Sequence, residues 1–183
     1  MSKRSDFLKI DKDKYYTPIA AVHPLIPHLP TTPFVYAEPC AGDGRLVRHI
    51  HELTEGKGVC NMAVDIEPDS MNINFGDARE IIVPLNVDLI ITNPPWTRTK
   101  ASGYLMHAII ENLARQAPTW LLFDADWAHT IQAKPMLEYC DKIVAIGRVR
   151  WIEDSKMSGK DNCAWYLFDN TTTGKRPTIF WGR

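Results

Sequence analysis

The sequence predicts an α/β protein with a doubly wound, mostly parallel sheet of seven strands and an antiparallel C-terminal hairpin. Short apolar runs typical of buried strands alternate with segments whose apolar residues recur at helical spacing. In the last third, two strand-like runs are joined by a polar loop instead of a helix. Alternating strand and helix patterns favour a parallel sheet covered by helices on both faces.

Each predicted element rests on its own local pattern. Residues 1–14 are polar and predict a mobile basic arm, whereas residues 15–183 are expected to form a single domain. Thr17 as N-cap and Pro18 as first helical residue predict a short helix. The predicted strands cover 34–38, 59–65, a short segment ending near 75, 87–92, 119–124, 142–152 and 163–169, and 178–181 is an open candidate for one more. The predicted helices cover 44–55, a short segment before 75, 103–116 and 128–139, the last interrupted by Pro135.

Composition excludes several classes of protein. The 183 residues are 45% hydrophobic and 23% charged, which is typical of a globular chain. No apolar run is long enough to span a membrane, and the first residues lack an apolar signal core, so a cytoplasmic protein is expected. The four cysteines form no CxxC pair and the histidines no HExxH, which predicts reduced thiols and no metal site. The net charge of −1 argues against a generic polyanion binder.

The tetrapeptide Asn93-Pro94-Pro95-Trp96 follows the predicted strand 87–92 and is the most informative motif. Two prolines fix φ and remove two backbone donors, so they predict a stiff loop. The Asn93 amide oxygen and the Pro94 carbonyl could accept the two protons of an exocyclic amine, while Trp96 stacks on the ring that carries it. The alternative is a strand end followed by a core aromatic residue.

A second loop, Glu38-Pro39-Cys40-Ala41-Gly42-Asp43-Gly44, ends the first predicted strand and opens the first long helix. Its small residues allow a ligand to approach the backbone closely. It matches neither the dinucleotide fingerprint nor the P-loop. The loop therefore suits a nucleoside with a short charged tail better than a polyphosphate, although a tight strand-to-helix turn would also explain it.

Two further acids lie at predicted strand ends. Asp65-Ile66 comes about twenty residues after the glycine loop, where an acid commonly binds ribose hydroxyls. Asp77-Ala78 follows the third strand, where a carboxylate could accept a proton from an adenine amine. Both acids have structural alternatives as caps of the segments that follow them.

These motifs, in this order, resemble the S-adenosylmethionine-dependent amino-methyltransferases that act on nucleic-acid bases. The nearest pattern is that of small, phage-type adenine N6 DNA methyltransferases. The resemblance covers residues 15 to about 125 well and is looser over the closing hairpin, where it rests on Arg150-Trp151-Ile152 and the run 162–168. It implies a Rossmann-like methyltransferase fold, S-adenosylmethionine as cofactor and methylation of an exocyclic base amine.

The resemblance also implies roles for individual residues. Catalysis falls to Asn93, Pro94, Pro95 and Trp96. Cofactor contacts fall to Tyr16, Thr17, Pro18, Glu38, Cys40, Ala41, Gly42, Asp65, Ile66, Asp77, Ala78 and Asn93. Substrate contacts fall to Trp96, Arg98, Lys100, Trp151 and Lys160. Trp151 is expected to cover the second face of the target base, with Trp165 and Trp127 as competitors.

The sequence departs from the family pattern in its length. About fifty residues separate the glycine loop from Asn93, which leaves no room there for a target-recognition domain, and none is expected after residue 170. Short or relaxed specificity is therefore expected, from a monomer or homodimer acting on DNA. RNA, cytosine N4 and, less favoured, a glutamine amide of a protein remain alternative targets. A non-catalytic interaction module is a further alternative.

Overall fold

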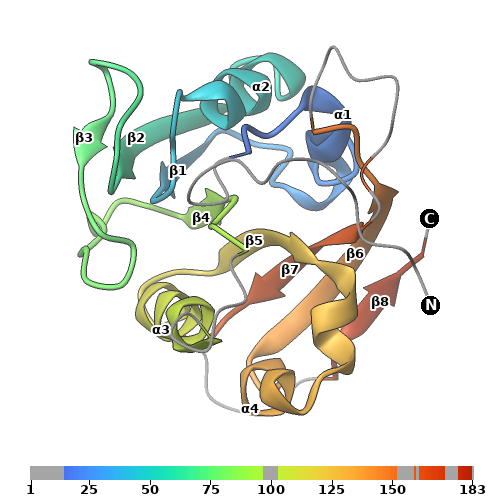
Figure 1. The fold of residues 1–183 in the computed structure, drawn as a ribbon. Coiled ribbons are helices and arrows are strands. Elements are labelled where there is room, and N and C mark those ends of the chain that lie inside the picture. Colours follow the sequence, from blue (N-terminus) through green and yellow to red (C-terminus); the bar gives the residue numbers. More distant parts are fainter. Residues whose placement is uncertain (1–14, 97–102, 152–158, 160, 172–176, 183) are drawn as a thin grey trace.

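The computed structural model describes residues 15–96, 103–151, 159, 161–171 and 177–182. Its strands form one sheet in the order β3-β2-β1-β4-β5-β7-β6-β8 (Figure 1). They are β1 (Phe34–Glu38), β2 (Gly58–Asp65), β3 (Asn74–Phe75), β4 (Leu89–Thr92), β5 (Thr119–Asp124), β6 (Cys140–Arg148), β7 (Asn162–Phe168) and β8 (Ile179–Trp181). The helices are α1 (Ile19–Val22), α2 (Arg45–Leu53), α3 (Gly103–Ala114) and α4 (Lys134–Leu137), with 3₁₀ turns η2 (Ile26–His28), η3 (Ala125–His129) and η4 (Ile131–Ala133).

The pairing confirms the predicted fold class. Strands β1 to β5 pair in parallel, and β7 is antiparallel to both β5 and β6. The sheet has eight strands instead of seven because Ile179–Trp181 pairs in parallel with β6. The hairpin strand β6 therefore lies inside the sheet, and β8 forms the edge.

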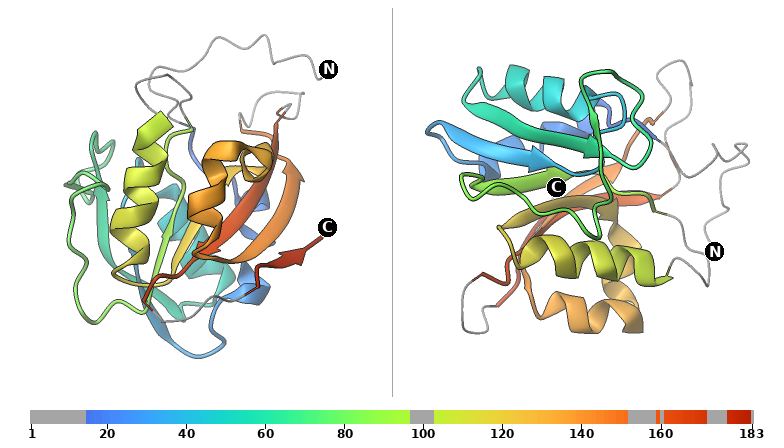
Figure 2. Two further views of the ribbon diagram at one scale, coloured as in Figure 1. Left: turned by 90° about the horizontal axis from the view of Figure 1, so that it is seen from below. Right: turned by 90° about the vertical axis from the view of Figure 1, so that its left-hand side faces the viewer.

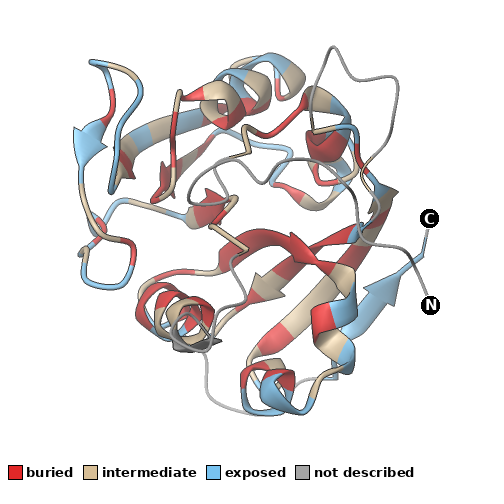
Figure 3. Cartoon of the chain, viewed as in Figure 1, coloured by how far each residue is buried: buried red, intermediate tan, exposed pale blue. Residues whose placement is uncertain are grey.

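The sheet separates two helical layers, with α1 and α2 on one face and α3 and α4 on the other (Figure 2). Strand β5, buried along its whole length, connects both cores (Figure 3). Trp120 and Leu122 pack with residues of α1 and α2, whereas Leu121 and Phe123 pack with α3 and α4. This alternation follows from the twofold period of side chains along a strand.

Three predicted helical features are wrong. The short helix expected before residue 75 does not form, because the chain between β2 and β3 makes only bends and a turn closed by the Ile73 N–H on the Ser70 carbonyl. The N-cap of α1 is Pro18, in an extended conformation and without a side-chain cap, so Thr17 precedes the cap instead of providing it. The single helix predicted over 128–139 is replaced by η3, η4 and α4. Thr130 interrupts it because this residue is extended and its hydroxyl accepts a hydrogen bond from the Ala133 N–H. Pro135 then lies at the start of α4, where its missing N–H is tolerated.

The strand order reverses between β1 and β4. From β1 the chain continues to β2 and β3 in one direction, and from β4 it continues to β5 in the other. The Cys40 N–H donates to the Thr92 hydroxyl at 3.1 Å, so the segments that follow the two strands are joined. Ligands of doubly wound sheets bind at such a reversal, at the carboxyl ends of the strands.

Candidate functional site

The glycine loop, residues 38–44, has a conformation that only its glycines adopt easily. Gly42 and Gly44 have φ angles of +53° and +76°. A β-carbon on Gly42 would also lie 3.4 Å from the Tyr16 ring. The Ala41 N–H donates to the Val64 carbonyl at 2.9 Å, which fixes the loop against β2. The loop is thus a closely packed turn between β1 and α2, as its composition predicts.

Asp65 fixes both the glycine loop and the turn after β2. Its Oδ2 accepts from the Gly42 N–H and its Oδ1 from the Glu67 N–H, each at 2.8 Å. A carboxylate oxygen has more than one acceptor site, so Asp65 keeps acceptor capacity for a hydroxyl group. Ile66, beside it, is exposed. The geometry therefore fits the structural and the ribose-binding interpretations of Asp65 together.

Glu38 is a buried carboxyl group whose Oε2 has no hydrogen-bond partner among the described residues. The residue is 1% exposed. Burial raises the pKa of this carboxyl well above its ordinary value, and the neighbouring Asp65 and Asp43 add to the effect. A buried acceptor without a donor is costly. An ammonium group would supply both the missing donor and the missing charge, so Glu38 fits the amino-acid portion of S-adenosylmethionine.

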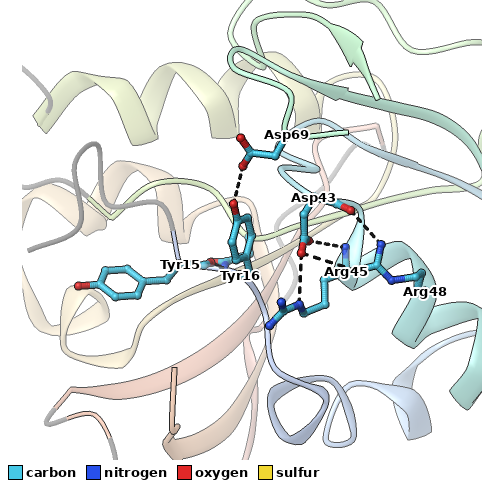
Figure 4. Close-up of polar contacts among 7 residues, drawn as sticks. Tyr15, Tyr16, Asp43, Arg45, Arg48 and Asp69 are labelled. Atoms are coloured by element: carbon cyan, nitrogen blue, oxygen red, sulfur yellow. Dashed lines mark hydrogen bonds and ion pairs between the residues drawn. The ribbon is translucent and has the colours of Figure 1, made fainter. Parts of the chain in front are cut away.

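The N-terminal strap, Tyr15–Pro18, crosses the glycine loop (Figure 4). The Tyr16 hydroxyl donates to Asp69 Oδ2 at 2.5 Å, and the Arg45 guanidinium carbon lies 5.2 Å from the Tyr16 ring centroid. The hydrogen bond to Asp69, with burial, raises the pKa of Tyr16 to about 12. Thr17 and Pro18 are buried. The strap therefore brings the first predicted motif onto the glycine loop.

Asp43 organises a charged cluster that the sequence motifs alone did not indicate. Its carboxylate lies 3.3 Å from Arg45 Nε and 3.6 Å from Arg48, and it accepts from the Arg45 N–H at 2.8 Å. Figure 4 shows this cluster beside Tyr16 and Asp69. The one sequence signal was the acid between two glycines. Asp69, in an irregular loop, gave no signal.

Asn93 is held by both ends of its amide. Its Nδ2 donates to the Tyr15 carbonyl at 3.1 Å, and its Oδ1 accepts from the Trp96 indole N–H at 3.2 Å. The same indole N–H lies 3.2 Å from the Leu122 carbonyl of β5. These partners determine which amide atom faces which way. Oδ1 retains a second lone pair, and no described residue donates to the Pro94 carbonyl, so two acceptors remain available.

The aromatic residues sort into those near the loop and those in the core. The Trp96 and Trp151 ring centroids are 5.2 Å apart at an interplanar angle of 86°. Trp165 is fully buried and donates to the Ala21 carbonyl, and Trp127 is buried in the other core. The structure thus brings Trp151 and not its competitors to Trp96. The two rings meet edge to face and do not form a parallel slot.

Asp77 makes the contacts expected of a residue that caps the segment after it. Both carboxylate oxygens pair with the Arg79 guanidinium, and Oδ1 also accepts from the Arg79 N–H at 2.9 Å. The Arg79 side chain lowers the pKa of Asp77. Ala78 is buried among core residues. An adenine amine would have to share the Asp77 carboxylate with Arg79.

Several predicted features lie outside the described residues. They are Arg98, Lys100, Lys160, the arm 1–14 and most of the polar loop 153–162. Within the described part, no group of three or more histidine, cysteine or acidic side chains could hold a metal ion. No described helix has the length and apolar character needed to cross a membrane.

No protein-family model matches this sequence, and neither does any curated protein. Solved structures do resemble it. A candidate RNA methyltransferase from Pyrococcus horikoshii has a TM-score of 0.56 at 18% identity, covering 91% of this chain and 92% of the other. A dimethyladenosine transferase from Plasmodium falciparum has a TM-score of 0.52 at 13% identity, covering 85% and 62%. The M protein of the type I restriction enzyme EcoKI has a TM-score of 0.51 at 16% identity, covering 85% and 44%.

This chain thus spans less than two thirds of the transferase and of the EcoKI subunit, but nearly all of the Pyrococcus protein. At these identities the likeness concerns the fold. It establishes the Rossmann-like methyltransferase fold that the resemblance implied.

Proposed function

We propose that this protein is an S-adenosylmethionine-dependent methyltransferase that methylates the exocyclic N6 amine of adenine in DNA. The carrying observation is the Asn93–Trp96 loop at the strand reversal, next to the glycine loop and the strap. Asn93 Oδ1 keeps a free acceptor position there, and no described residue donates to the adjacent Pro94 carbonyl. The buried Glu38 carboxyl group, whose Oε2 has no partner among the described residues, supports the cofactor assignment, because it fits an ammonium group.

The residues of the loop account for the chemistry. The lone pair of an aromatic amine is delocalised into its ring, which makes the amine a poor nucleophile. Acceptors at Asn93 Oδ1 and the Pro94 carbonyl would hold both amine protons and favour a tetrahedral nitrogen with a localised lone pair. Bound S-adenosylmethionine supplies an activated methyl group. Alignment and electrostatics then account for much of the catalysis, and the released proton can pass to water.

RNA is the second candidate substrate. The similar Pyrococcus structure is described as a candidate RNA methyltransferase, and the likeness covers almost the whole of both chains. An exocyclic amine in structured RNA would use the same acceptors. A target inside a duplex must first leave the base stack, which costs a few kcal/mol.

One experiment separates the candidates. The protein is incubated with isotopically labelled cofactor and with DNA, RNA or protein extract, and the modified residue is identified by digestion and mass spectrometry. We expect N6-methyladenine in DNA. Label found only in protein would refute a nucleic-acid target, and label found only in RNA would select the second candidate.

The roles of Asn93 and Asp65 separate in a pair of variants. Asn93→Ala removes an acceptor from the target amine and should lower the transfer rate by about 100-fold or more. Its cofactor affinity, measured by calorimetry, should stay nearly intact, with no more than the few-fold loss expected from removing the hydrogen bond to the Tyr15 carbonyl of the strap. Asp65→Ala should weaken cofactor affinity first, by about tenfold. Full transfer activity in Asn93→Ala would contradict the role of the loop.

A further inference from the structure

A groove of about 750 Å³ lies on the α1–α2 face of the sheet, between α1, η2 and α2 on one side and β6 and β8 on the other. We call it the arginine groove. Residues that line it include Pro18, His28, His49, Arg148, Arg150 and Trp181. Pro18 belongs to the N-terminal strap. Arg150 directly precedes Trp151, whose ring lies against Trp96. The groove therefore includes one residue of the strap and, in Arg150, the chain neighbour of a ring of the candidate site.

The groove is cationic although the chain is not. Acidic residues outnumber lysine and arginine by 22 to 21 in the whole chain, yet none of the described residues that line the groove carries a carboxylate side chain. Arg148 and Arg150 are exposed, and neither forms an ion pair with a described residue. By contrast, Arg45, Arg48 and Arg79 are all paired with aspartates. A free guanidinium suits a phosphate group, which it can bind through two parallel hydrogen bonds.

The groove also presents an aromatic ring. Trp181 pairs with Val144 in the sheet, and Val144 packs into the α1–α2 core, so the Trp181 side chain projects on that face. It is 49% exposed. His28 supports it edge-on at 5.1 Å, and the Lys142 amine lies 6.0 Å from its ring centroid. An exposed indole beside a lysine amine provides a stacking surface for a base with its phosphate beside it.

We propose that the arginine groove binds the unpaired strand that flanks the target base, with phosphates at Arg148 and Arg150 and a base on Trp181. The groove is too small for a duplex. Its volume lies in the range of pockets that bind small molecules. Because Arg150 directly precedes Trp151 in the chain, a strand bound at Arg150 would lie near the target base. The proposal rests on the proposed nucleic-acid function and adds where the substrate lies.

The test measures binding of a fluorescein-labelled single-stranded oligonucleotide by anisotropy at several salt concentrations. The protein is the full chain with a saturating non-reactive cofactor analogue. Arg148→Gln/Arg150→Gln should bind at least tenfold more weakly at low salt. Each lost phosphate contact lowers the salt slope by about 0.7, so the slope should fall by about 1.4. Lys57→Gln/Lys134→Gln, the same change in charge at exposed sites away from the groove, should bind as the wild type does.

Two further variants test whether a base stacks on Trp181. Trp181→Phe keeps a ring and should bind within about threefold of the wild type, whereas Trp181→Leu should lose about tenfold. Cofactor affinity by calorimetry should be unchanged in all variants, which shows that they are folded.

If the wild type methylates nucleic acid but the double arginine variant keeps the oligonucleotide affinity and the salt slope of the wild type, the proposed binding role of the groove is wrong. A wild type that methylates no nucleic acid would instead overturn the proposed function.

Discussion

Glu38 is the residue whose chemistry is least explained by the fold alone. Its carboxyl is buried without a partner for Oε2 among the described residues, and its pKa is raised. A buried carboxyl group in this state lowers the stability of the protein without ligand. Sites that bind charged ligands often carry such a cost, because the ligand later supplies the compensating group.

This cost should appear in the pH dependence of stability. Above an ordinary glutamate pKa of 4.5 the unfolded chain ionises while folded Glu38 stays protonated. The free energy of unfolding of the ligand-free protein should therefore fall as pH rises through this window, by up to about 1.4 kcal/mol per pH unit from this group. Glu38→Gln should remove that part of the fall and weaken cofactor binding. Chemical denaturation between pH 4.5 and 7.5 measures it.

Glu138→Gln changes an exposed carboxylate in the same way and serves as the control. An identical pH profile for Glu38→Gln and the wild type would show that Glu38 is not protonated in the folded protein.

The indole N–H of Trp96 distinguishes it from other aromatic residues. It donates toward Asn93 Oδ1 and the Leu122 carbonyl, so it orients the amide that holds the target amine. Trp96→Phe retains a ring but loses this N–H, and it should lower kcat by about tenfold with little change in KM. Trp96→Leu should also raise KM, because stacking is lost. Steady-state kinetics of the two variants separate orientation from stacking, and unchanged kcat in Trp96→Phe would leave stacking as the only role.

At the scale of elements, the N-terminal strap contacts both the glycine loop and Asn93. Tyr16→Phe removes the hydroxyl that binds Asp69 and should weaken cofactor affinity about two- to tenfold, because the strap would hold the glycine loop less firmly. Calorimetry measures the affinity. Tyr139→Phe removes a hydroxyl from a half-buried tyrosine that precedes β6, and it should have no such effect. Equal affinities for the wild type and Tyr16→Phe would assign the strap a purely structural role.

The elements also show what the sequence could predict. The strand ends that carry Glu38, Asp65 and Asn93 followed from local apolar runs, and parallel pairing brings such ends to one edge. The contacts between elements could not be predicted from these local runs. The position of Trp151 depends on the path of the chain after β6, a strand whose pairing shifts register between Ala145 and Gly147. A bulge of this kind leaves no apolar periodicity that a sequence pattern could detect.

Over the whole molecule, the four cysteines are distributed over both cores. Burial raises the pKa values of Cys60, Cys140 and Cys163 to about 12, and it raises that of Cys40 as well. The thiolate is the reactive form, so folded protein at pH 7.5 should resist iodoacetamide at all four positions. In urea all four should react. Mass spectrometry of the labelled protein counts the adducts, and fast labelling of native Cys40 would show that the glycine loop opens.

The strap also connects the cofactor region of the site with the region expected to hold the target base. Tyr16 packs on the glycine loop, and the adjacent Tyr15 holds the Asn93 amide, so a single peptide link joins the two regions. Thermodynamic reciprocity then applies. If a ligand in one region steadies the strap, it favours the ligand of the other region by the same factor. We therefore expect the cofactor and the target base to bind cooperatively, with this peptide link as the coupling element.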